Sequence, residues 1–222
     1  VPFFEWEQLK VFDELPADSI NMRIQETLTA KAAPPSVPGS ADQWAKQRTG
    51  WMNALREKSF RGWPSEACPL DVEQVFSVQR HGIRLSAFDF TSQKHIRLRL
   101  YLAQRAGLDE ADKVVIKVMD EQGWTKWLAA VGAGFAAEVK DQPLPETNEE
   151  AFRQYIEALK NTNNAVAYVM GRGIGPTIWS TDKRKLKEIR RRFMLLGQTL
   201  DGMRTWDVGR AIQAVRSRNI ES

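Results

Sequence analysis

Two short, almost wholly apolar runs, KVVIKVM (113–119) and AVAYVM (165–170), constrain the fold of this chain more than any other feature. Runs of this length and composition are typical of strands that are covered on both faces of a sheet. The sequence between them is long enough for two helices, at 124–139 and 147–160, and the second begins with Thr147 at the first position of a capping box. This strand, helix, strand order predicts an α/β crossover.

Sequence with a period of two precedes these runs. Residues 74–90 predict two strands around His81-Gly82, where glycine can adopt the positive φ of a tight hairpin. Residues 95–103 alternate apolar and polar side chains, which is typical of a strand whose faces see different surroundings. We therefore expect an α/β fold with a mixed sheet, with antiparallel strands first and parallel βαβ crossovers after them.

Three segments of different character follow one another along the chain. Residues 1–40 are expected to form a connector with a short helix, ended by the proline-rich break APPSVPGS (33–40). Residues 41–71 predict a helical segment whose aromatic stripe docks on the domain that follows. Residues 72–222 are expected to form that domain.

Composition argues against several kinds of site. The chain has one cysteine, Cys68, and two histidines, so it has no internal disulfide and lacks the usual ligand set of a metal site. No stretch approaches the roughly 20 apolar residues of a membrane helix. We expect no metal, no cofactor and no membrane partner. The sequence does not indicate the cellular compartment, and a parent protein could be exported.

Positive charge gathers in one run, DKRKLKEIRRRF (182–193), although the net charge of the whole chain is only +4. Such a run could be a footprint for nucleic acid or anionic lipid. It could equally be the solvated side of a helix, because Leu186, Ile189 and Phe193 recur at helical spacing. We favour the helix and expect no nucleic-acid partner, because no nucleic-acid-binding signature accompanies the run and Glu188 interrupts it.

Two loops follow the buried runs, DEQGW (120–124) and GRGIGP (171–176). In open α/β sheets, ligands bind beyond the carboxyl ends of parallel strands, so both loops lie at the expected ligand edge. A dinucleotide fingerprint has the spacing G-x-G-x-x-G and opens into a helix, whereas here the spacing is G-x-G-x-G and a proline follows at once. We therefore expect a structural turn formed by Gly171, Gly173, Gly175 and Pro176.

Four side chains of these loops are candidate ligand-binding residues at the rim of the sheet: Asp120, Glu121, Trp124 and Arg172. Asp120 and Glu121 could act as an acid/base pair. The interpretation we favour is that Asp120 caps the following helix and Glu121 is solvated. Arg172 either anchors the turn to a neighbouring carboxylate, which we favour, or meets a ligand.

A serine and histidine group elsewhere offers a second candidate for catalysis. Ser86, Ser92, His81 and His95 are close in sequence, and a serine nucleophile needs a base within hydrogen-bond reach. Alternation places many of them along strands near the antiparallel edge, away from the ligand side. We expect them to be structural or exposed.

The run GRGIGPTIWS…IRRRFMLLGQTLDGMRTWDVGRAIQAVRS (171–217) resembles part of the α/β-hydrolase domains related to acetyl xylan esterases, in two-domain proteins typical of planctomycete bacteria. Residues 172–175 fit the R-G-x-G turn after the fourth core strand of α/β hydrolases. Residues 206–212 fit the helix before the nucleophile strand. Residues 3–28 resemble the connector after an upstream esterase-like domain, which would make this chain that connector plus the N-terminal part of the second domain.

The resemblance implies a partial α/β-hydrolase fold and a parent that is a serine carboxylester hydrolase acting on ester groups of polysaccharides. In such enzymes the serine lies on a G-x-S-x-G elbow after the next strand, and the acid and histidine follow. This sequence contains no G-x-S-x-G. We therefore expect no catalytic residue here and no hydrolysis of small acetyl esters by the chain alone. The alternative is a non-catalytic accessory or interaction domain with a degenerate elbow.

The resemblance also bears on partners. They would be the remainder of the parent hydrolase or the upstream esterase-like domain. A chain that forms only the front part of the domain is expected to leave strand 165–170 with one unpaired side, and unpaired strand edges favour self-association.

Overall fold

The computed structural model describes residues 3–19, 24–28 and 33–218. Two compact units divide the chain, Val1–Arg48 and Thr49–Ser222. The sheet and the helices that cover it belong to the second unit.

The described residues of the first unit form little regular structure. It holds the short 3-10 helix η1 (Trp6–Leu9), the helix α1 (Ile24–Leu28) and the start of α2 (Ala41–Ala54). Ser40 marks the beginning of α2, because its Oγ accepts a hydrogen bond of 3.2 Å from the main-chain N–H three residues further on. The helix crosses into the second unit, where a π-helical turn, η3 (Leu55–Ser59), follows it.

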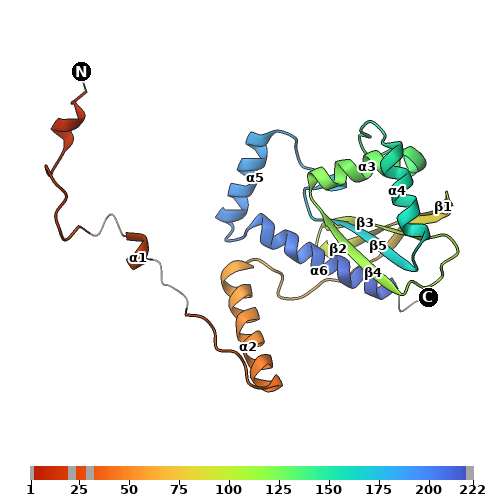
Figure 1. Cartoon of the computed structure of the whole chain (residues 1–222), viewed down its shortest axis with the longest axis horizontal. Coiled ribbons are helices and arrows are strands. Elements are labelled where there is room, and N and C mark those ends of the chain that lie inside the picture. Colours follow the sequence, from red (N-terminus) through yellow and green to blue (C-terminus); the bar gives the residue numbers. More distant parts are fainter. Residues whose placement is uncertain (1–2, 20–23, 29–32, 219–222) are drawn as a thin grey trace. The chain divides into compact units, whose positions relative to one another are not determined.

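The second unit is built on one sheet of five strands in the order β1-β2-β3-β5-β4 (Figure 1). The strands β1 to β3 pair antiparallel, β5 pairs antiparallel with β3, and β4 and β5 pair parallel. This confirms the predicted mixed α/β sheet. The strands are β1 (Glu73–Arg80), β2 (Ile83–Gln93), β3 (Ile96–Arg105), β4 (Lys113–Met119) and β5 (Asn164–Met170).

The hairpin between β1 and β2 forms where the sequence predicts it. His81 and Gly82 have φ angles of 52° and 78°, so both central residues lie in the left-handed region that a two-residue hairpin requires. Arg80 and Ile83 close the turn as paired residues.

The edge strands of the sheet are β1 and β4, and the expectation that residues 165–170 keep an unpaired side is wrong. The crossover carries the chain from β4 back between β3 and β4, so β5 is paired on both sides. The expectation that β4 is buried on both faces is also wrong, since Val115 and Val118 are 36% and 59% exposed. An apolar run shows that a strand forms but does not distinguish a central strand from an edge strand.

Helices cover the two faces of the sheet separately (Figure 1). On one face lie α3 (Glu121–Phe135), its 3-10 extension η4 (Ala136–Glu138) and α4 (Glu149–Lys160). The other face is covered by α6 (Leu200–Arg218), which contacts β2 and β5. Between β5 and α6 run the short turn η5 (Gly175–Thr177) and the helix α5 (Lys183–Leu195), which has no buried residue.

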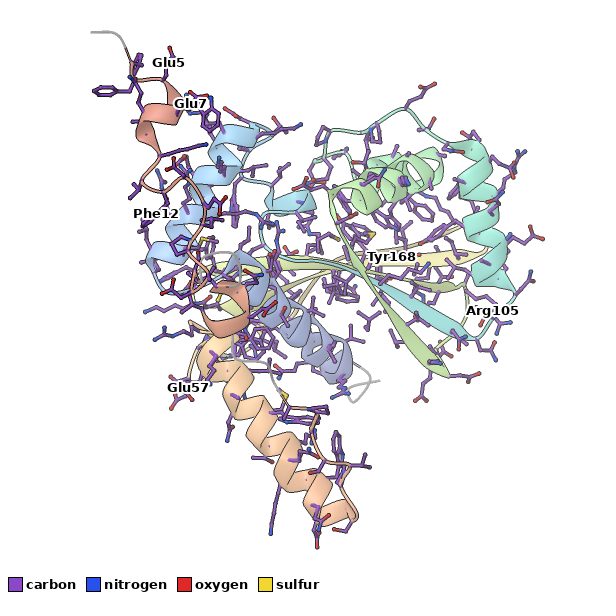
Figure 2. The ribbon with its side chains drawn as sticks, turned by 60° about the vertical axis from the view of Figure 1, so that its left-hand side comes forward. Glu5, Glu7, Phe12, Glu57, Arg105 and Tyr168 are labelled. Carbon is purple, nitrogen blue, oxygen red and sulfur yellow. The ribbon has the colours of Figure 1, made fainter. Side chains whose placement is uncertain are left out.

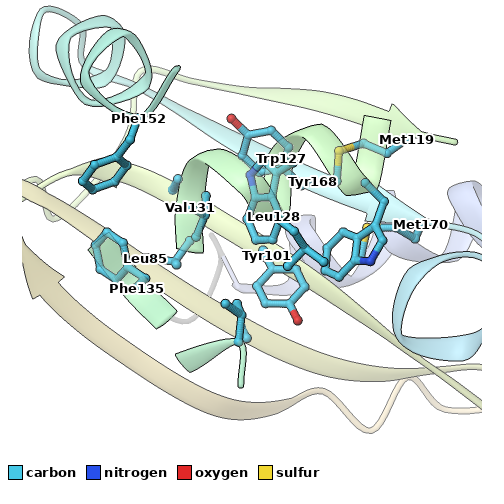
Figure 3. Packing of buried hydrophobic residues seen from close by; sticks show 14 of the residues in the cluster. Leu85, Tyr101, Met119, Trp127, Leu128, Val131, Phe135, Phe152, Tyr168 and Met170 are labelled. Carbon is cyan, nitrogen blue, oxygen red and sulfur yellow. The ribbon is translucent and has the colours of Figure 1, made fainter. Parts of the chain in front are cut away.

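The core on the α3 and α4 side is rich in aromatic rings (Figure 3). Trp127 lies 4.8 Å from Tyr101 and 5.3 Å from Tyr168, measured between ring centroids. Tyr168 comes from the middle of the sheet and lies on the side of α3 and α4 (Figure 2). A smaller core, with Phe90 and Val169 fully buried, fills the space under α6. The two cores fix both helix layers on the sheet.

The segment that precedes β1, residues 60–68, contacts α6. The Trp63 indole donates a hydrogen bond of 2.7 Å to the carbonyl of Gly202, and its ring stacks on Phe60 with centroids 4.5 Å apart. Further along, Arg210 donates a hydrogen bond to the carbonyl of Cys68. These contacts hold the segment that runs from Phe60 to Cys68 against α6.

Candidate functional site

A cleft of about 450 Å³ opens beside the N-terminal turns of α3. Its walls come from three segments: the start of α3, the loop at 142–145, and the chain from the glycine turn to the start of α5. Because α3 follows β4 and the glycine turn follows β5, the cleft lies beyond the carboxyl ends of the two parallel strands. This is the ligand edge of an open α/β sheet.

The cleft is mainly apolar, with polar groups at a few positions. Its apolar residues are Trp124, Leu128, Pro143, Leu144, Pro145, Ile178 and Leu186. Its polar side chains are Glu121, Thr125, Gln142, Ser180, Thr181 and Lys183. Walls of this kind suit a small ligand that is part apolar and part hydroxylated.

The first turn of α3 holds three of the candidates from the sequence. Asp120 caps the helix, because its Oδ1 accepts a hydrogen bond of 2.7 Å from the main-chain N–H of Gly123. Glu121 is exposed and lines the cleft. Trp124 also lines it, yet is only 6% exposed because its ring stacks on Trp127 at 5.1 Å. Among the three, Glu121 and Trp124 face the cleft.

The glycine loop is a packed turn. At Gly173, where φ is +73°, a Cβ atom would lie 2.7 Å from two carbons of the Trp179 ring. At Gly175, where φ is +60°, it would lie 3.2 Å from the ring of Trp124. The main-chain N–H of Gly173 donates a hydrogen bond of 3.0 Å to Thr177 Oγ1. Both glycines therefore let an indole lie against the main chain, and Pro176 falls within η5.

Arg172 points away from the cleft, into a buried ion pair with Asp207 of α6. Its Nε and Nη2 donate hydrogen bonds of 2.9 and 2.7 Å to the two carboxylate oxygens, and its main-chain N–H adds a third of 2.9 Å. The Arg172 and Asp207 side chains are 7% and 0% exposed. Arg172 thus anchors the turn to a carboxylate, as the favoured interpretation has it.

Ser92 belongs to the same buried network. Its hydroxyl donates a hydrogen bond of 2.5 Å to Asp207, and its carbonyl accepts one of 2.9 Å from the indole of Trp206. The expectation that Ser92 lies away from the ligand side is wrong, because the antiparallel pairing of β3 and β5 brings the β2–β3 turn to the carboxyl end of β5. We name Arg172, Asp207 and Ser92 the buried latch, since they join the turn, α6 and β2.

The remaining serine and histidine candidates do not converge. His81 lies at the opposite end of the sheet, with its ring 5.3 Å from Phe152. His95 is exposed in the β2–β3 turn with φ 67°. The hydroxyl of Ser86 lies 2.9 Å from that of Ser77, which satisfies both. They are structural or exposed, as expected.

Sequence reasoning missed the wall that Ser180, Thr181 and Lys183 contribute to the cleft. The available signal was Asp182, whose carboxylate accepts a hydrogen bond of 2.8 Å from the main-chain N–H of Arg184 and so starts α5 at that point. Because α5 starts at Lys183, the first residues of the basic run lie at the cleft.

Burial perturbs the tyrosines behind the cleft. It raises the pKa of Tyr101 and of Tyr168 to about 12, and it raises the pKa of Tyr155 well above its ordinary value. None of the three lines the cleft. Within the described part of the chain, no three His, Cys, Asp or Glu side chains cluster as metal ligands, and no described helix is long and apolar enough to cross a membrane.

Comparison with known proteins identifies the fold. No protein-family model matches the chain, and no curated protein matches its sequence. The structure is similar to that of a protein from Bacteroides fragilis NCTC 9343 assigned as an acetyl xylan esterase, with a TM-score of 0.63 and 14% identity over 94% of this chain. A CE15 glucuronoyl esterase from Teredinibacter turnerae T7901 matches with a TM-score of 0.40 and 15% identity, over 77% of this chain and 37% of that one.

The first likeness shows the class of fold. The chain has an α/β-hydrolase-like fold with a mixed sheet of five strands. It spans 53% of the length of the acetyl xylan esterase-like protein.

Proposed function

We propose that this chain forms the front part of the α/β-hydrolase domain of an acetyl xylan esterase-related protein. The parent would be a serine carboxylester hydrolase that removes ester groups from polysaccharide. In that arrangement the chain is the N-terminal part of a second domain with its connector, and its partners are the rest of that hydrolase and an upstream esterase-like domain. The planctomycete resemblance of residues 171–217 supports this arrangement.

The observation that carries the proposal is the position of the cleft. It lies beyond the carboxyl ends of β4 and β5 and beside the first turn of α3, where the strand-to-helix loop of an active hydrolase provides an oxyanion donor. An apolar wall around Trp124 and Leu144 suits an acyl group. The hydroxyls of Thr125 and Ser180 suit the hydroxyl groups of a sugar.

The cleft of this chain suits binding better than catalysis. Hydroxyl side chains line it, but no histidine is among its lining residues. A serine or threonine hydroxyl is a weak nucleophile without an adjacent base. We therefore expect the nucleophile, the acid and the histidine to come from another part of the parent. A second candidate, a non-catalytic accessory domain, is favoured by the burial of Arg172 and Ser92 in the latch, which leaves neither free for chemistry.

Two measurements on the purified chain test the proposal. The chain should bind an acetylated xylo-oligosaccharide in a calorimetric titration and should not hydrolyse 4-nitrophenyl acetate above the buffer rate. The variant T125W should fill the cleft and weaken binding roughly tenfold or more. The matched control is K126W, which changes the neighbouring position on α3 that does not line the cleft.

Three outcomes would count against the proposal. Turnover that survives purification and disappears with a substitution inside this chain would place catalysis here. Equal loss of binding in T125W and K126W would remove the cleft as the binding site. A complete reading frame that lacks a G-x-S-x-G elbow followed by an acid and a histidine would favour the accessory domain.

A further inference from the structure

The helix α5 exposes more apolar surface than a solvated helix needs. Its inward side is formed by Leu186, Ile189 and Phe193, yet none of these is fully buried. At its C-terminal end Leu195 and Leu196 are 85% and 74% exposed. Contiguous apolar exposure of this kind marks an interaction surface more often than a solvated face.

These side chains surround a hollow of about 400 Å³. Its walls are Trp179, Ile189, Phe193 and Leu196, with Arg192 at the same hollow. The rings of Trp179 and Phe193 lie 6.0 Å apart at 29°. The ring of Trp179 also rests against Gly173, so the hydrolase-type turn holds one wall in place. The hollow is thus formed in the structure as it stands.

Most of the positive charge on α5, the helix that forms the hollow, has no acidic partner among the described residues. Of the seven Lys and Arg residues of α5, Arg190 and Arg191 pair with Asp201 and Glu188 at 3.4 and 2.9 Å. The other five form no ion pair with any described residue: Lys183, Arg184, Lys185, Lys187 and Arg192. A second hollow of about 520 Å³ adjoins the first through Ile189 and Arg192. Arg184 and Lys185 line it together with Asp182 and Glu188, so three cations face two carboxylates there. Apolar and cationic recognition elements therefore lie side by side.

We propose that this surface, which we name the α5 dock, binds an acidic peptide segment of a protein partner. An aromatic or large aliphatic side chain of the segment fills the apolar hollow, and its carboxylates face Arg192 and Lys185. Charge complementarity and an apolar anchor together match the known mode in which peptides bind grooves. The proposal is independent of what the cleft binds.

The shape of the dock favours a peptide over the other anionic partners. Nucleic acid would satisfy the charges, but it has no aliphatic side chain for a hollow walled by Ile189 and Leu196, and the rings of Trp179 and Phe193 already stack on each other. A bilayer surface would engage the protruding Leu195 and Leu196, but it would leave the hollow between Trp179, Ile189 and Phe193 unfilled.

Fluorescence anisotropy with the whole chain and a labelled peptide tests the proposal. The probe is a short glutamate-rich peptide with two tryptophans. One control peptide replaces the tryptophans by serine and another replaces the glutamates by glutamine. We expect each control to bind roughly tenfold more weakly, and the probe to lose affinity as salt rises. Equal binding of probe and serine control would reduce the dock to a charged surface and overturn the proposal.

Two matched variants locate the binding. R192Q and R191Q remove the same charge from adjacent positions, but only Arg192 lines the hollow. We expect R192Q to weaken binding roughly tenfold and R191Q less than about twofold. L196E, at an exposed position, should abolish the anchor while circular dichroism stays unchanged. Equal effects of R192Q and R191Q, or stronger binding to phosphatidylserine vesicles or to single-stranded DNA than to the probe, would overturn the proposal.

Discussion

Replacing Asp207 by asparagine is the sharpest test of the buried latch. Each carboxylate oxygen now accepts two donors: Oδ1 from Ser92 and Arg172 Nη2, and Oδ2 from the main-chain N–H and Nε of Arg172. An asparagine side chain has one acceptor oxygen and one NH₂ group. With the NH₂ group at the Oδ2 position, it faces the main-chain N–H and Nε of Arg172, and both hydrogen bonds are lost. At the Oδ1 position it faces Arg172 Nη2 and that hydrogen bond is lost, while the Ser92 hydroxyl can turn and accept from it.

The expected loss is large because the surroundings cannot provide solvent in place of the carboxylate. Asp207 is fully buried and the Arg172 side chain is 7% exposed, so D207N leaves an uncompensated guanidinium in the interior. Removing one partner of such a pair costs about 3–5 kcal/mol. The free energy of unfolding of a whole domain is about 5–15 kcal/mol, so D207N should use up a large part of it.

Urea unfolding followed by tryptophan fluorescence measures the effect, with an unchanged m value as the condition for comparing midpoints. The control is D201N, because Asp201 is 69% exposed and lies 3.4 Å from Arg190, which predicts a loss under about 1 kcal/mol. A double variant gives a test of sign. In the wild-type background D207N should lower the free energy of unfolding. In the R172M background it should leave that free energy unchanged or raise it, because it removes the charge of a buried carboxylate that has lost its cation.

Two results would refute the reasoning. One is a loss below about 1 kcal/mol in D207N, which would mean that the site hydrates or relaxes. The other is simple additivity of D207N and R172M, which would mean that the two charges do not stabilise each other.

Two further predictions concern the glycine turn and alkaline pH. G173A should destabilise the fold more than G107A. Gly107 shares the positive φ, but a Cβ atom added there would meet nothing within 4 Å, so the difference between the two urea midpoints reports the contact with Trp179. Equal losses in the two variants would mean that backbone strain alone destabilises them. Raising the pH should unfold the protein. A tyrosine whose folded pKa exceeds the unfolded value near 10 stabilises the fold below about pH 10, and this contribution is lost as the pH rises through 12. For a pKa of about 12, the loss is roughly 3 kcal/mol. Absorbance of tyrosinate should appear together with unfolding, and free titration near pH 10 would contradict the burial of these rings: Tyr101, Tyr155 and Tyr168.

Local patterns predicted the elements of the fold well. Alternation placed the hairpin at His81-Gly82, and the apolar runs placed β4 and β5. The cap at Asp120 was also predicted correctly, but the cap of α4 was not. The capping spacing pointed to Thr147, but α4 is capped by Asn148, whose Oδ1 accepts a hydrogen bond of 2.9 Å from a main-chain N–H. Adjacent residues with similar capping propensity differ only in how the chain enters the helix, and tertiary contacts decide that.

Tertiary arrangement limited what the sequence could say about the site. Nothing in the spacing of Ser92, Arg172 and Asp207 reveals that they meet, because the contacts span 115 and 35 residues. The sequence also could not show which of β4 and β5 is the edge strand. The side on which the crossover returns decides this, and a βαβ pattern is satisfied with either strand at the edge. The sequence did predict that Glu121 and Trp124 lie at the cleft. Chain order alone shows which residues follow the carboxyl end of a parallel strand, and ligands bind at that edge of the sheet.

The glycine turn explains why the cleft and the α5 dock are neighbours in one structure. Gly175 lies against Trp124 of the cleft and Gly173 against Trp179 of the dock, while the buried latch fixes the turn between them. Beyond the turn, Ile178 and Ser180 face the cleft and Trp179 faces the dock. A single extended stretch thus forms walls on two sides. Because its main chain is shared, we expect a shift that opens one surface to move the wall of the other.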